Sequence, residues 1–125
     1  MNMPEGFPEE LNKNAINLLE AIYLDENAWP YHDALLVLKW LRDHRFLILG
    51  GDFITITPKI GYAEDPSSHW GFHTDDSKSI EQNTQLSYEA AVKYVEAVYK
   101  REGSKYYFSF GFRHADLPPL TWPND

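Results

Sequence analysis

Gly50-Gly51-Asp52 interrupts an apolar stretch and is the group of residues whose types most suggest chemistry. Two glycines before a carboxylate raise the question of a phosphate loop, a metal site or a catalytic acid. A P-loop needs Lys and Ser or Thr at the start of a helix after its glycines, and a dinucleotide fingerprint needs three spaced glycines. Here Phe53 and Ile54 follow, and the strand pattern resumes. We therefore interpret the glycines as a β-bulge or a close backbone approach, with Asp52 serving either the packing or a surface site.

Two histidines invite the same question. His69 and His73 would share one face of a helix, but on a strand they lie about 13 Å apart, too far to share a metal ion. The alternating pattern around them favours a strand, so we expect no metal site. Ser67, His69 and Asp65 form a hydrolase triad only on paper, because the Gly-x-Ser-x-Gly turn is absent. We expect no catalytic residue and no cofactor. The alternatives are a small enzyme or ligand-binding domain with a cleft around Asp52, His69 and His73, or a structural adaptor.

The composition is that of a globular protein with an acidic surface. The 125 residues carry a formal net charge of −8, and their 43% hydrophobic and 15% aromatic content supports one core. This charge argues against a nucleic-acid-binding surface, which would need a basic stripe. The chain has no cysteine, no signal-peptide pattern and no apolar run of about 20 residues. We expect a cytoplasmic protein outside the membrane, with acidic residues concentrated in 1–33 and 64–99.

Hydrophobic periodicity predicts three helices. The first runs from Pro8 to about Ile22, and the second begins at Pro30 and is apolar nearly all round. The third has Ser87 as its N-cap and Gly103 as its C-terminal stop. Its buried stripe should consist of Ala91, Tyr94, Val95, Val98 and Tyr99.

Three strands complete the expected fold, at 46–57, 68–74 and 105–114. The first two are close enough to pair antiparallel, and the last could join 68–74 in parallel or 46–57 antiparallel. The order ααββαβ predicts an α+β fold with a small three- to four-stranded, mostly antiparallel sheet packed by about three helices. Residues 1–125 should form a single domain with a short irregular tail at about 115–125. The helix-covered face of the sheet should hold Trp70, Phe72, Phe108, Phe110 and Phe112.

Three stretches resemble a known family. They are ALLVLKWLRDHRFLILGGD, the tryptophan segment HWGF, and SYEAAVKYVEAVYKREGSKYYFSF. They resemble immunity proteins of bacterial polymorphic toxin and contact-dependent inhibition systems, in particular immunity protein family 40. The resemblance covers about residues 30–113 and rests on Gly50, Gly51 and Asp52, with Trp70 about twenty residues later. It implies that the protein binds a cognate toxin domain in the producing cell and silences it without catalysis.

Under this resemblance, the acidic loop residues are candidates for the toxin-facing surface. Glu64, Asp65, Asp75 and Asp76 flank the Trp70 strand at both ends, where loops are free to meet a partner. Acidic segments suit a basic toxin, such as a nuclease, through steering and charge complementarity. The alternative is that these four residues only keep the protein soluble.

Overall fold

The computed structural model describes residues 3–17, 27–57, 61–64 and 70–116, and it confirms an α+β fold. The predicted tail at 115–125 therefore lies, beyond residue 116, outside the described residues. The elements follow one another as α1 (Glu9–Asn14), β1 (Ile16–Asn17), β2 (Asn27–Ala28), α3 (Tyr31–Asp43), β3 (Phe46–Thr57), β4 (Gly61–Glu64), β5 (Trp70–Gly71), α4 (Ile80–Glu102), a 3-10 turn (Gly103–Lys105) and β6 (Tyr106–His114).

Strand β3 is the centre of the main sheet. It pairs antiparallel with β6 along one edge, and with β4 and then β5 along the other. Of the two pairings open to the last strand, the structure has the antiparallel one with 46–57. The short strands β1 and β2 pair with each other. Trp29 joins them to the main sheet through two backbone hydrogen bonds with Phe108, of 2.8 and 2.7 Å.

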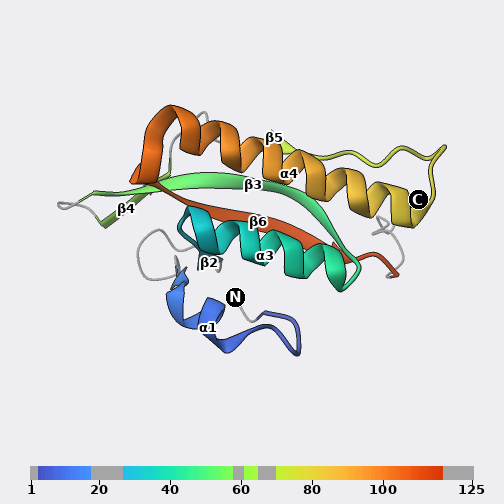
Figure 1. Ribbon diagram of the computed structural model, residues 1–125, viewed down its shortest axis with the longest axis horizontal. Coiled ribbons are helices and arrows are strands. Elements are labelled where there is room, and N and C mark those ends of the chain that lie inside the picture. The colour runs from blue at the N-terminus through green and yellow to red at the C-terminus, as the bar shows by residue number, and fades with distance from the viewer. Residues whose placement is uncertain (1–2, 18–26, 58–60, 65–69, 117–125) are drawn as a thin grey trace, which may run out of the picture.

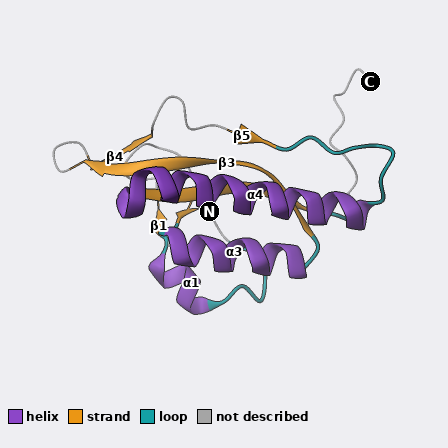
Figure 2. Ribbon diagram, turned by 45° about the horizontal axis from the view of Figure 1, so that its top comes forward, coloured by secondary structure: helices purple, strands orange, loops and turns teal. Residues whose placement is uncertain are grey.

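Helices α3 and α4 pack against each other and against one face of the sheet (Figures 1 and 2). This confirms the predicted aromatic face, to which Trp70 and Phe112 contribute as partly buried members. Phe72 is the exception: it lies beyond the end of β5, is only half-buried and does not belong to the core. The buried centre of the cluster includes Val37, Leu38 and Leu41 from α3, Ala91, Val95 and Val98 from α4, and Phe108 and Phe110 from β6.

A β-bulge in β3 decides which of its side chains enter the core. Ile48 pairs with Phe112 and Gly50 pairs with Gly111, so Leu49 is the extra residue. Without it, strict alternation would have placed Asp52 on the same face as Ile48, against the helices. The bulge reverses the alternation, because two residues of one strand then oppose one of its neighbour. Phe53 therefore enters the core, and Asp52 lies on the opposite face.

The first predicted helix is wrong beyond its second turn. Helix α1 ends at Asn14, Ala15 is extended, and Ile16 pairs with Ala28 as the start of β1. Backbone pairing between distant segments has overridden a local helical pattern, which periodicity cannot foresee. The remainder of the predicted helix, from residue 18 to about Ile22, lies outside the described residues.

The last helix begins earlier than predicted. Ser79 is its N-cap, and Ser79 and Gln82 form a reciprocal capping box. Ser87 lies inside the helix instead. Its hydroxyl donates to the carbonyl of Thr84 and accepts the backbone N–H of Ile48, beside the bulge. The predicted stop at Gly103 is confirmed, with φ of 68°.

Candidate functional site

The two glycines of the Gly-Gly-Asp motif lie in β3 between β5 and β6, where backbone atoms of both neighbouring strands come close to them; we call this region the glycine contact. A Cβ atom on Gly50 would overlap the backbone oxygen of Trp70, and one on Gly51 would overlap the backbone oxygen of Ser109. On Gly51 it would also lie 2.9 Å from Trp70 Nε1 and 3.1 Å from Phe110 Cδ1. The structure confirms the predicted close backbone approach. This position demands glycine because backbone atoms, which cannot move aside independently, occupy the space.

Trp70, in the edge strand β5, covers the glycine contact. Its backbone pairs with Gly51, and its ring lies 5.2 Å from that of Tyr94, at a tilt of 34°. The indole Nε1 is buried and has no acceptor among the described residues. Packing against Gly51 and Tyr94, rather than a hydrogen bond of the indole, therefore places the ring. The part of the motif formed by Gly50, Gly51 and Trp70 acts in the sheet itself.

The alternative cleft of Asp52, His69 and His73 gains no support from the strand register. Asp52 is half-buried and pairs with Ser109, on the face away from the helices. His73 is exposed and lies two residues beyond Gly71, which pairs with Gly50. The two side chains are thus separated by roughly 13 Å along β3. His69 lies outside the described residues, as do Ser67 and Asp65 of the paper triad.

Three of the four predicted partner-binding acids, Glu64, Asp75 and Asp76, are among the described residues, and these three do not form one patch. Glu64 ends β4 and pairs with Ile54, near one end of β3. Asp75 and Asp76 line a hollow with Leu47, near the other end. Seven residues of strand separate these points, roughly 23 Å. Asp65, the fourth acid, lies outside the described residues.

Asp75 is committed to the turn that starts α4. Its carboxylate accepts the backbone N–H of Ser77 at 2.9 Å and the Ser77 hydroxyl at 2.6 Å. These bonds, the hydroxyl first, lower the pKa of Asp75 below its ordinary value. The Asn83 side chain holds the backbone of the same residue, accepting its N–H at 2.8 Å and donating to its carbonyl at 3.0 Å. Asp76 is exposed and has no ion-pair partner among the described residues.

Two further acids near this end of the sheet are paired with Arg45. This residue turns the chain from α3 into β3 with φ of 64°, and its guanidinium contacts Asp116 at 2.7 Å and Glu81 at 3.2 Å. The hydrogen bond from Arg45 lowers the pKa of Asp116. The pKa of Glu81 is also lowered, first by its backbone N–H and then by Arg45. Much of the acidic charge around the start of α4 is therefore engaged within the protein.

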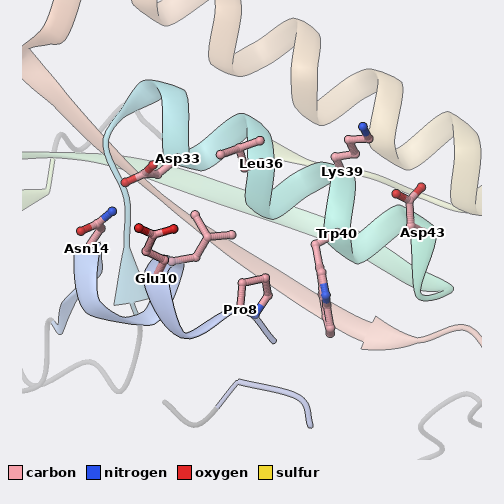
Figure 3. Close-up of a pocket in the computed structure, with 9 residues that line it drawn as sticks. Pro8, Glu10, Asn14, Asp33, Leu36, Lys39, Trp40 and Asp43 are labelled. Carbon is pink, nitrogen blue, oxygen red and sulfur yellow. The ribbon is translucent and has the colours of Figure 1, made fainter. Parts of the chain in front are cut away.

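Sequence reasoning missed a groove between α1 and α3. It has a volume of about 350 Å³, and Glu10, Asn14 and Asp33 gather at one end of it, with Pro8 and Trp40 at the other (Figure 3). Leu36 lines it and is 54% exposed, the most exposed of the large hydrophobic side chains in the described part of the chain. Lys39 and Asp43 also border it but point away from α1 in this view.

Two signals in the sequence pointed toward this groove. Residues 1–33 are acidic, and they supply Glu10 and Asp33. The second predicted helix is apolar nearly all round, which leaves an apolar residue on the side of α3 turned away from the sheet. Neither signal identifies a groove by itself, because the sequence does not say that α1 packs beside α3.

The described residues contain no cluster of three or more metal-ligating side chains that could hold an ion. None of the helices in the described part of the chain is long and apolar enough to span a bilayer.

Comparison with protein families identifies the chain. The model of the family described as immunity protein 40 matches residues 17–112. This chain belongs to the immunity protein 40 family. The matched segment includes the bulge, Trp70 and both long helices, whereas α1 lies before it. Comparisons with curated proteins and with solved structures found no match.

Proposed function

We propose that this immunity protein 40 family member binds a cognate toxin domain by direct contact and neutralises it without catalysis. The observation that carries the proposal is the family match over residues 17–112, because immunity proteins act by silencing a toxin. The toxin would belong to a polymorphic toxin or contact-dependent inhibition system, and the complex would form in the cytoplasm of the producing cell.

The charge of the protein favours a basic partner, such as a nuclease domain. A net charge of −8 on 125 residues gives a long-range attraction for cationic surfaces. We assign the steering of that partner to Glu64, Asp65, Asp75 and Asp76. The separation of Glu64 from Asp75 and Asp76 along β3 suits an attraction summed over a surface better than a single contact patch. Of the two acids that follow β5, Asp76 is the stronger candidate, because the carboxylate of Asp75 is hydrogen-bonded to Ser77 whereas Asp76 has no ion-pair partner among the described residues.

The test uses a candidate toxin domain, to be sought in the gene immediately upstream of the one that encodes this protein. Co-expression should protect cells, and the two purified proteins should form a stoichiometric complex. Replacing all four steering acids by Lys should slow association about tenfold at low salt, and raising the salt should remove most of this difference. A complex whose association rate ignores both salt and charge reversal would remove these four residues from the proposal. The absence of any complex with the unmodified protein would overturn the immunity function for that toxin.

A further inference from the structure

The groove between α1 and α3 is built before any partner arrives. Its α3 wall is fixed by Val37, Leu38 and Leu41, which are fully buried against the sheet side of the molecule. Its α1 wall is tied to the core by a buried hydrogen bond of 2.8 Å, from Trp29 Nε1 to the carbonyl of Leu11. Phe7, just before α1, contacts Trp40 edge-on with ring centroids 5.1 Å apart. Binding there would require little ordering, which preserves affinity.

The groove offers an apolar surface and available negative charge together. Leu36 remains 54% exposed within it, whereas its neighbours Val37 and Leu38 are buried. Glu10 and Asp33 stand at one end and have no ion pair among the described residues. An apolar surface bordered by unpaired carboxylates is complementary to a segment that carries apolar and cationic side chains side by side.

We propose that this groove is the docking site for a basic, amphipathic segment of the cognate toxin. An apolar toxin side chain covers Leu36 and Trp40, and Lys or Arg side chains beside it reach Glu10 and Asp33. This inference rests on the proposed function and adds the surface and the chemistry of the partner. A second copy of this chain is the poorer occupant, because it would bring two acidic surfaces into contact.

In this proposal, the groove and the loop acids affect different steps of toxin binding. In both views of the molecule, α1 and β5 lie on opposite sides (Figures 1 and 2). The loop acids, of which Asp75 and Asp76 follow β5 in the chain, act at a distance and set the association rate, which salt reduces. The groove acts in contact and sets the dissociation rate, where most of the variation among related complexes occurs.

The experiment measures toxin binding by matched variants with the same change of charge. The groove variant combines Leu36→Ser with Glu10→Lys and Asp33→Lys. The control combines Leu86→Ser with Glu89→Lys and Glu96→Lys on α4, where Leu86 is 36% exposed and both acids are exposed. The probe is the upstream toxin domain, and binding is followed by biolayer interferometry. The groove variant should dissociate at least about tenfold faster, whereas the control stays within about twofold of the unmodified protein.

A second measurement does not depend on any variant folding. In the unmodified 15N-labelled protein, addition of the toxin domain should shift amide signals of Glu9–Asn14 and of the Leu36 turn of α3. Signals of the outer face of α4, around Glu89 and Glu96, should move less. Shifts confined to other surfaces, or a groove variant that binds like the control, would overturn the groove while leaving the immunity function intact.

Two further outcomes also decide the matter. Self-association of the protein alone that Leu36→Ser abolishes would assign the groove to a second copy and overturn the proposal. If the unmodified protein forms no complex with the toxin domain, the proposed function fails, and the groove assignment that rests on it fails too.

Discussion

The glycine contact around Gly50 and Gly51 and the groove between α1 and α3 differ in almost every physical respect. At the glycine contact, backbone atoms are so close that there is no room for a methyl group. In the groove, the side chain of Leu36 is 54% exposed, and the carboxylates of Glu10 and Asp33 have no ion pair among the described residues. One region is closed by packing, and the other is open to solvent.

This contrast shows that the residues that stand out in the sequence need not be the residues that are free to contact a partner. Gly-Gly-Asp and Trp70 stand out in the sequence, yet the glycines and the tryptophan are explained by how β3, β5 and β6 meet. Leu36 and Asp33 are ordinary residues for a helix and attract no attention when read along the chain. A surface able to recognise a partner arises from them because α1 lies beside α3.

The largest loss of stability should come from adding a methyl group at the glycine contact. Gly51→Ala should lower the free energy of unfolding by about 3 kcal/mol, because the new methyl group meets the Ser109 carbonyl, which is fixed in the sheet. Gly111→Ala is the matched control in the neighbouring strand, since a Cβ there meets nothing within 4 Å. It should be neutral or slightly stabilising. Urea unfolding measures the free energy of unfolding of both variants. Equal values would show that the glycine contact is not closed by packing.

An intermediate effect is expected where the two regions are connected. Trp29→Phe removes the buried donor to the Leu11 carbonyl and should cost about 2 kcal/mol. The loss should also loosen α1, so its backbone amides should exchange with solvent faster. Trp40→Phe provides the comparison, because Trp40 is only partly buried and its ring donates no hydrogen bond to any of the described residues. Unchanged exchange in α1 would mean that the hydrogen bond does not hold the groove wall.

The smallest effect should come from the open region. Leu36→Ala should change the free energy of unfolding by less than about 0.5 kcal/mol, because its side chain is already exposed. Leu38→Ala, two residues along the same helix, should cost about 2–5 kcal/mol because Leu38 is fully buried. Thermal unfolding of both variants tests the pair. A large loss for Leu36→Ala would show that the groove is part of the core and would remove the basis of the comparison.

The fold class and most of the long elements can be read from local patterns along the chain. These patterns are the periodicities of 31–43 and 106–114, the stop at Gly103 and the aromatic face of the sheet. The predicted elements form because the residues that make up each pattern are also the residues buried in the core. Ser79 and Gln82 also have capping-box spacing in the sequence, although the predicted N-cap is Ser87. The family resemblance likewise rested on residues that can be read directly, and the match over 17–112 bears it out.

Other features of the protein cannot be read from the chain in this way. The end of α1 at Asn14 depends on pairing between Ile16 and Ala28, and the role of Gly51 depends on Ser109, which is far away in the chain. The four loop acids seemed equivalent in the sequence, but Asp75 is engaged by Ser77, and Glu64 lies near the other end of β3. The groove combines residues from α1 and α3. Such features depend on contacts between distant segments, and local patterns carry no information about which segments will meet.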